Sequence, residues 1–446
     1  AVNCHRVHTA PAMSKNLVIV ESPAKAKTIS KYLGDDFDVL ASYGHVRDLV
    51  PKEGAVDPDH DFAMKYQVIE RNEKHVNAII KALKKADALY LATDPDREGE
   101  AISWHLIELL REKNALDDKD VHRVIFHEIT KNAVRDAIDH PRGLSGDLVG
   151  AQQARRALDY LFGFNLSPLL WRKVAGAKSA GRVQSPALRM IVERELEIEA
   201  FKAREYWTIE ADLSKDQQPF ASRLVSYRGD KVEQFSFENE EQAREVETTL
   251  LDAAQGELTA LTVTKKQRRR NPTAPFTTST LQQEASRKLG FNTQRTMRVA
   301  QKLYEGIELP GEGNVGLITY MRTDSVTLAA VALEEIREVI ADRYGKENVP
   351  AEAREFKTKS KNAQEAHEAI RPTSVARAPE AIKAALDDDQ FRLYALIWRR
   401  TMASQMIPAV FDTVAVDFTA GSPDAGHRLR ANGSVLVVPG FMAVYQ

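Results

Sequence analysis

The sequence has almost no cysteine: Cys4 is the only one among 446 residues. A single thiol cannot close an internal disulfide, and it cannot supply the paired cysteines of a zinc ribbon. We therefore expect no zinc, and a reducing compartment such as the cytoplasm. No apolar run approaches the roughly 18 residues of a transmembrane helix, so no membrane partner is expected. Residues 1–14 also lack the apolar core of a secretory signal.

Two common catalytic motifs are missing as well. No G-x-x-x-x-G-K-[ST] loop occurs, so the sequence does not imply ATP. The string AHEAIRP places Arg371 where the second histidine of an HExxH zinc motif would stand, which excludes that class of metalloprotease.

Acidic and basic residues are nearly balanced overall, but they are unevenly distributed along the chain. The formal net charge is −2, with 43% hydrophobic and 28% charged residues, a normal balance for a globular protein of roughly two to four domains. Between residues 155 and 189 there are seven Lys and Arg against one Asp, whereas residues 230–257 hold nine acids against two bases. Because local charge decides binding, the net value does not exclude nucleic acid.

Strand and helix patterns alternate through the first 140 residues. Apolar β-rich runs at 16–20, 88–92 and 121–126 are each followed by a helical pattern, at 24–33, 99–113 and 131–138. This alternation predicts a parallel sheet with crossover helices, and such sheets bind ligands at the carboxyl ends of their strands. Glu21 and the string DPDRE at 94–98 both lie at such ends.

DPDRE offers three carboxylates, Asp94, Asp96 and Glu98, on a short extended segment. Hard oxygen ligands of this kind suit Mg²⁺, which keeps waters for a phosphate. The alternative is a charged loop that caps the following helix. If Glu21 lies beside Asp94 and Asp96, like-charge repulsion should raise its pKa and let it carry a proton near neutrality.

The string GLITYMRTDS places Tyr320 two residues before Arg322 and four before Asp324. A nearby cation stabilises a phenolate and an incoming phosphate, so this spacing suits attack on a phosphodiester. The alternative is a tyrosine that is merely packed.

The remaining chain divides into basic helical and alternating segments. Two helices with a Gly/Ser/Lys-rich loop between them are predicted from residue 147, and short antiparallel strands are predicted over 205–265 with a helical insert at 238–251. KKQRRR at 265–270 is either a solvated hinge or a phosphate contact. A helical region is expected from 286 past Tyr320, then helices at 328–344 and 380–406, and strands over 410–445. The loop that holds Lys178, Arg182, Gln184 and Ser185 offers backbone amides and short donors for phosphates.

Several strings, taken in order, resemble the motifs of type IA DNA topoisomerases in their bacterial topoisomerase I form: VIVESPAKAKTI, SYGHVRDL, DPDRE, PFTTSTLQQEA, GLITYMRTDS and AHEAIRP. Glu21 with DPDRE is similar to a TOPRIM domain. The resemblance implies that Tyr320 forms a 5′-phosphotyrosine, that Glu21 is the general acid/base at the leaving 3′ oxygen, and that Lys25 contacts the scissile phosphate. It also implies a role for His367 at that phosphate, assisted by Arg371. The DNA-binding residues that it implies are His45, Arg155, Lys178, Arg182, Gln184, Ser185, Asp324 and Arg371.

The family fold is multidomain α/β and α+β and, as a whole, toroidal. The resemblance therefore implies a TOPRIM domain at 15–146, a helical DNA-groove domain at 147–204, a β-rich arch at 205–275 and 407–446, and a helical domain at 276–406 that carries the tyrosine. The implied activity is relaxation of negatively supercoiled DNA without ATP, with Mg²⁺ as cofactor and single-stranded segments as substrate, by a monomer at the nucleoid.

Three alternatives stay open: a topoisomerase III-like decatenase, a TOPRIM nuclease or primase that would not need Tyr320, and an inactive single-strand clamp. Family members continue past Gln446, and FMAVYQ at the end reads as an apolar strand. We therefore expect a fragment that is incomplete for relaxation.

Overall fold

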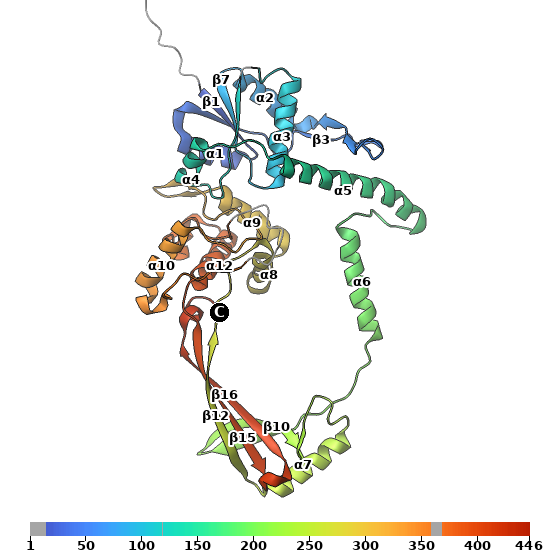
Figure 1. Ribbon diagram of the computed structural model, residues 1–446, viewed down its shortest axis with the longest axis vertical. Helices are drawn as coiled ribbons and strands as arrows, with labels where there is room; N and C mark the ends of the chain where they lie inside the picture. The colour runs from blue at the N-terminus through green and yellow to red at the C-terminus, as the bar shows by residue number, and fades with distance from the viewer. Residues whose placement is uncertain (1–14, 118, 358–367) are drawn as a thin grey trace, which may run out of the picture. The chain divides into compact units, whose positions relative to one another are not determined.

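A computed structural model describes residues 15–117, 119–357 and 368–446, and Figure 1 shows the order of its elements. The chain forms two compact units. The first holds residues up to 187 together with 273–405, and the second holds 188–272 together with 406–446. The second unit contains residues 205–272 and 407–446 of the two segments predicted for the β-rich arch, while residues 273–275 fall in the first unit. The finer division into four domains stays a prediction.

The first unit is built on a four-stranded parallel sheet of order β2-β1-β7-β8. Its strands are β1 (Lys15–Val20), β2 (Phe37–Ala41), β7 (Ala86–Leu91) and β8 (Asp120–Arg123). The crossover helices are α1 (Pro23–Leu33), α2 (Glu73–Leu83), α3 (Arg97–Glu112) and α4 (Lys131–Asp139). The predicted parallel sheet is thus confirmed, and β2 and α2 are additions. Short hairpins follow β2, from β3 (Arg47–Leu49), β4 (Val56–Asp57), β5 (Ala63–Met64) and β6 (Tyr66–Val68).

Burial explains how the sheet is covered. Alternate residues of a strand point to opposite faces, and Leu17 and Ile19 of β1 share one apolar core with residues of α2 and α3. Val18 and Val20 therefore face the other side, where α1 and α4 pack together in Figure 1. With both faces covered, only the strand ends are left open to a ligand.

Two long helices follow α4, as predicted. Helix α5 (Gly146–Lys173) begins at Ser145, whose side chain accepts a hydrogen bond from the Leu148 amide, and it packs on α3. Helix α6 is Gln184–Ala200. Neither helix is a candidate membrane span, and none was found among the described residues.

The rest of the first unit is helical, with one exception at the tyrosine. Helices α8 (Thr278–Leu289) and α9 (Thr293–Glu305) precede a hairpin of β13 (Ile307–Leu309) and β14 (Gly313–Val315). Helices α10 (Ala330–Tyr344), α11 (Pro379–Ile382) and α12 (Asp388–Ser404) follow. The expected helix through Tyr320 is wrong, because residues 316–320 are extended and bridge to the segment around Pro372.

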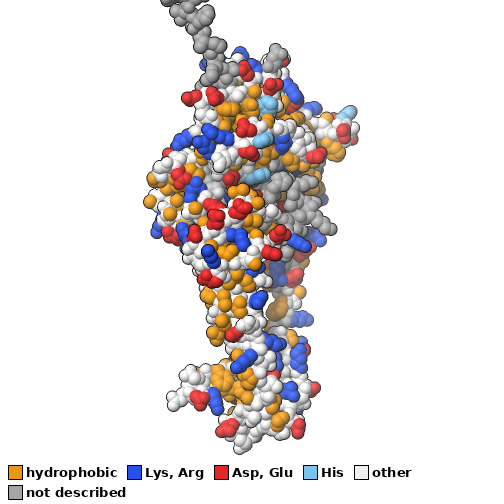
Figure 2. Space-filling model, turned by 60° about the vertical axis from the view of Figure 1, so that its left-hand side comes forward, with side chains coloured by type: hydrophobic (Ala, Val, Ile, Leu, Met, Phe, Trp, Pro, Cys, Tyr) orange, Lys and Arg blue, Asp and Glu red, His pale blue; other side chains and the backbone are white. Residues whose placement is uncertain are grey.

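The second unit is a six-stranded antiparallel sheet with helix α7 (Glu240–Ala254). Its strands are β9 (Glu210–Lys215), β10 (Gln218–Tyr227), β11 (Asp230–Lys231), β12 (Leu258–Arg270), β15 (Ala409–Ala420) and β16 (Arg428–Val438). KKQRRR is neither a hinge nor a loop but the second half of β12. The strand expected at FMAVYQ is also wrong, because Gly440–Ala443 forms a turn of 3-10 helix. Figure 2 shows acidic and basic side chains interspersed on the visible face.

Candidate active site

The first part of the site lies at the carboxyl ends of β1 and β7. These strands pair in parallel, so Glu21, just after β1, and Asp94, three residues after β7, meet at one edge. Lys25 joins them: its Nζ lies 2.6 Å from Glu21 Oε1 and 2.6 Å from Asp94 Oδ1. The structure therefore brings together two residues that are 73 positions apart in sequence.

Lys25 is fully buried because α1 begins at the site. Pro23 occupies the first turn and the Ser22 side chain accepts a hydrogen bond from the Lys25 amide, which fixes the lysine one turn inside the helix. Its ammonium also lies 5.2 Å from the ring centroid of Tyr304. Burial alone would lower the pKa of Lys25, but Asp94 and Glu21 outweigh it and hold that pKa well above its usual value.

Glu21 holds a proton near neutrality. Burial first, and the charge of Asp94 second, raise its pKa to about 8, although Lys25 works in the opposite direction. One ammonium cannot neutralise two carboxylates, and burial favours the neutral form of Glu21. Its Oε2 has no hydrogen-bond partner among the described residues. The expected rise in pKa is confirmed in direction, but Asp96 does not contribute to it.

Asp96 both caps a helix and holds the tyrosine. Its Oδ1 accepts a hydrogen bond from the Gly99 amide at 2.9 Å, which starts α3, and its Oδ2 accepts one from the Tyr320 hydroxyl at 2.6 Å. Gly99 is required here, because a Cβ at that position would collide with the Asp94 carbonyl. The alternative function of DPDRE, as a helix cap, is therefore present alongside any metal role.

Tyr320 is buried at the junction between the sheet and the helical region. Its side chain is 1% exposed, its amide donates to the His127 carbonyl at 2.8 Å, and its ring meets Tyr304 edge-on at 5.3 Å. Burial, then Asp94 and Asp96, raise its pKa above the usual value of a phenol. Arg322 lowers the pKa of Tyr320, as predicted, but burial first and the two carboxylates second outweigh that effect.

Arg322 is the exposed cation of the site. Its side chain is 56% exposed, and its Nη1 lies 3.5 Å from Asp96 Oδ2. Arg322 therefore reaches solvent while the tyrosine does not, which leaves its guanidinium available to a phosphate.

Glu98, the third acid of DPDRE, is held by two partners. Its Oε2 lies 3.4 Å from His45 Nε2 and 3.4 Å from Gln152 Nε2. The hydrogen bond from His45 is the main reason that its pKa falls to about 2, despite partial burial. Glu98 is therefore a carboxylate at any physiological pH.

A cavity of about 870 Å³ joins these groups. Residues from the sheet edge, α5 and α9 line it: Glu21, His45, Asp94, Asp96, Arg97, Glu98, Gly99, Ile102, Arg155, Met297, Arg298, Gln301 and Arg322. The sequence analysis did not find Arg298 and Gln301. Their spacing of three puts them on one face of α9, but nothing in the sequence shows which face meets the cavity.

The carboxylates of DPDRE have the right chemistry for a divalent cation, since all are hard oxygen donors that face one cavity. In the structure these carboxylates already have partners. Asp94 accepts a hydrogen bond from Lys25, and Asp96 accepts one from Tyr320. Glu98 is in contact with His45 and Gln152. Among the described residues, no three His, Cys, Asp or Glu side chains converge as a ready-made site. The donor set fits a cation, and binding requires these carboxylates to leave their present partners.

The remaining predicted residues are dispersed. Of the residues predicted to bind DNA in the groove domain at 147–204, only Arg155 lines the cavity. Arg182 pairs with Asp159, Gln184 donates to Ser179, and the Ser185 hydroxyl accepts from the Gly181 amide. Lys178 and Asp324 are exposed.

Arg371 is buried rather than open to DNA. Its guanidinium donates hydrogen bonds to the carboxylates of Glu368 and Glu128, the latter at 2.9 Å. It also donates one to the carbonyl oxygen of Pro372. In this arrangement it holds the segment that bridges to Thr319. Its contact with DNA stays a prediction, and His367 lies outside the described residues.

Comparison with known proteins identifies the two parts of the chain. A family model described as "DNA topoisomerase" matches residues 144–446, and one described as "Toprim domain" matches residues 16–129. Toprim domains are generally associated with divalent metals, which agrees with the donor set above.

Full-length relatives carry the same name. The chain is 61% identical to "DNA topoisomerase 1" of Xylella fastidiosa (strain Temecula1), over 97% of this chain and 53% of that protein. It is 53% identical to "DNA topoisomerase 1" of Rickettsia bellii, over 96% of this chain and 53% of that protein. The solved structure of full-length topoisomerase I from Thermotoga maritima matches with a TM-score of 0.80 and 37% identity, over 96% of this chain and 67% of that one. The chain spans about half the length of the curated relatives that it matches.

Proposed function

The chain belongs to the bacterial type IA DNA topoisomerase family, and from this membership we propose that it cuts one strand of DNA through a covalent bond to Tyr320 and then rejoins it. The observation that carries the proposal is the placement of the Tyr320 hydroxyl 2.6 Å from Asp96, in the cluster that also holds Glu21 and Lys25. A protonated acid, a buried cation and a hydroxyl nucleophile are the groups that a transesterification needs.

In the proposed reaction the Tyr320 oxygen attacks the phosphorus of a single-stranded segment, and the bond between phosphorus and the 3′ oxygen breaks. Glu21, which keeps its proton near neutrality, gives that proton to the leaving oxygen. The phenol loses its proton during attack, and Asp96 Oδ2 is the acceptor to which it is already bonded. The products are a 5′-phosphotyrosine and a free 3′ hydroxyl, and the reverse steps rejoin the strand.

Charge on the phosphate is neutralised by the chain's own cations. Lys25 already spans Glu21 and Asp94, and Arg322 is exposed beside the tyrosine, so both can approach the phosphate oxygens. A divalent cation held by Asp94, Asp96 and Glu98, for which we propose Mg²⁺, would supply further positive charge when bound. The substrate that we propose is a single-stranded segment of negatively supercoiled DNA. The supercoiling itself would drive the reaction without ATP, and this substrate would place the protein at the nucleoid.

A labelled oligonucleotide tests the proposal. The chain is incubated with single strands that carry the label at either end, stopped with denaturant and separated on a gel. A 5′-phosphotyrosine leaves only the 3′-labelled strand attached to protein, and peptide mapping should find the adduct on Tyr320. Attachment of the 5′-labelled strand, or an adduct on another residue, would reject the mechanism. Cleavage without any adduct would identify a TOPRIM nuclease instead.

A further inference from the structure

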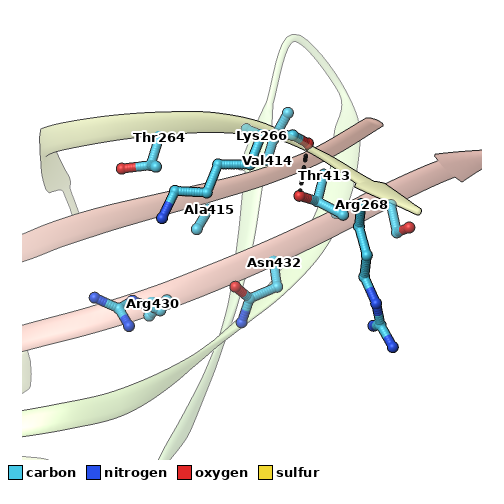
Figure 3. Close-up of a pocket in the computed structure, with 10 residues that line it drawn as sticks. Thr264, Lys266, Arg268, Thr413, Val414, Ala415, Arg430 and Asn432 are labelled. Carbon is cyan, nitrogen blue, oxygen red and sulfur yellow. Dashed lines mark hydrogen bonds between the residues drawn. The ribbon is translucent and has the colours of Figure 1, made fainter. Parts of the chain in front are cut away.

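A second basic surface lies in the other unit, on the sheet strands β12, β15 and β16 (Figure 3). The three strands pair in antiparallel register, so Lys266 lies beside Thr413, which in turn lies beside Ser434. The surface is hollowed into a cavity of about 470 Å³. Its lining residues are Thr264, Lys266, Arg268, Thr413, Val414, Ala415, Arg430, Asn432, Gly433 and Ser434.

Strand alternation places its cations on one face. Lys266 and Arg268 are two residues apart on β12, so both side chains leave the same side, about 6.7 Å apart. Both are exposed, and neither forms an ion pair with any residue that the structure describes. Arg430 shares this face but is engaged by Asp417, at 2.6 and 3.0 Å. The face therefore carries an excess of positive charge.

The polar side chains beside these cations are of the types that contact phosphate in protein–DNA complexes. Asn432, Ser434 and Thr264 supply an amide and hydroxyls around Lys266 and Arg268. No aromatic side chain lines the cavity. Phe411, which pairs with Arg268 at one end of this face, is half-buried. Surfaces that hold single strands combine basic groups with exposed aromatic platforms for the bases, whereas a surface whose exposed polar groups are cations, hydroxyls and an amide suits a backbone whose bases are stacked and paired.

We propose that this face of the sheet binds the phosphate backbone of duplex DNA, at a site separate from the cavity around Tyr320. A duplex strand presents one phosphate per 3.4 Å or so of helix axis, so Lys266 and Arg268 can contact phosphates of the same strand without any change in the sheet. Binding is independent of base sequence, because no group of the surface is arranged to read base edges.

The same strand offers a matched control. Lys265 and Arg269 also lie on β12 but alternate to the opposite face, where Val263 and Val435 are exposed at 58% and 67%. K265A/R269A therefore removes the same charge from the same strand while leaving the proposed surface intact. Long-range attraction to DNA would be lost equally in both variants, but a specific contact would not.

The experiment measures binding of the 446-residue chain to a labelled blunt duplex across a range of salt concentrations. Each lost phosphate contact should reduce the slope of log affinity against log salt by about 0.9, so K266A/R268A should reduce it by about 1.8. K265A/R269A should leave the slope within error of the wild type. Both variants should keep the wild-type unfolding midpoint and form the Tyr320 adduct with short single strands.

Two results would overturn the proposal. An unchanged slope in K266A/R268A, or an equal loss in both double variants, would show that the face does not contact the backbone. If K266A/R268A weakens binding to a single strand of thymidines but not to the duplex, the assignment to duplex DNA is wrong. Because adduct formation is measured separately, failure here does not bear on the proposed cleavage.

Discussion

Replacing Tyr320 with phenylalanine separates chemistry from packing at the proposed active site. The substitution removes one oxygen and keeps the ring, which is 1% exposed and packed edge-on against Tyr304. The lost hydrogen bond of 2.6 Å goes to a carboxylate, and such bonds contribute about 1.5–3 kcal/mol. Asp96 keeps its bond from Gly99, and the adjoining cavity admits water, so we expect a loss of about 1–2 kcal/mol in the free energy of unfolding.

The covalent adduct should disappear completely in Tyr320→Phe, because no phenol remains to attack. Affinity for single strands should stay within a few-fold of the wild type, since the buried hydroxyl adds little to ground-state binding. Denaturing gels with a 3′-labelled oligonucleotide measure the adduct, fluorescence anisotropy measures affinity, and urea titration measures stability.

Tyr304→Phe is the control for this experiment. Tyr304 is also fully buried, and its ring centroid lies 5.3 Å from that of Tyr320, but its hydroxyl is bonded to no carboxylate among the described residues and has Lys25 as its charged neighbour. Its removal should cost little stability and should preserve the adduct. An adduct that persists in Tyr320→Phe, or that vanishes equally in Tyr304→Phe, would refute the assignment. A parallel loss of binding and cleavage in Tyr320→Phe would show that the tyrosine is structural.

Three further predictions concern the proton, the metal and the buried arginine. Because burial and Asp94 raise the pKa of Glu21 to about 8, the folded chain binds this proton more tightly than the unfolded chain, and stability should fall as pH rises from about 4.5 through about 8. Glu21→Gln should flatten that part of the profile in thermal melts, and identical profiles would contradict the shift. A chelator should leave cleavage intact but block rejoining of the cut oligonucleotide, so equal rejoining with and without chelator would remove the metal role. Arg371→Met leaves the carboxylates of Glu128 and Glu368 without their cation and should cost about 3–5 kcal/mol in urea titrations, whereas a loss below about 1 kcal/mol would show that the ion pairs are dispensable.

The sheet and its ligand-binding edge could be predicted from the sequence because both follow from local patterns. Apolar runs alternating with helical periodicity are enough to place Glu21 and Asp94 at strand ends, and parallel pairing then brings those ends together. Family motifs added Lys25, which no periodicity singles out. The parallel sheet was predictable from these local patterns, whereas the family was predicted from the resemblance of the motifs.

The electrostatics of the site could not be predicted, because they depend on distances between segments that lie far apart in sequence. Tyr320 and Asp96 are 224 residues apart, and burial of the phenol together with Asp94 and Asp96 outweighs the lowering effect of Arg322 on its pKa. KKQRRR was ambiguous for a related reason. A basic run has no apolar alternation, so only its pairing with β15 shows that it is a strand.

The buried position of Tyr320 constrains how any phosphodiester reaches it. The hydroxyl is bonded to Asp96, and the backbone around it is held to the sheet domain by bonds from Tyr320 to His127 and from Gly316 to Ile129. A phosphodiester can therefore reach the hydroxyl only after the packing of Tyr320 against Tyr304 opens. Asp96 Oδ2 already accepts the hydrogen bond of the hydroxyl, so it is placed to take the proton during attack. Loss of burial on opening removes the largest cause of the raised pKa of Tyr320, and Arg322, which lies beside Asp96, lowers that pKa further.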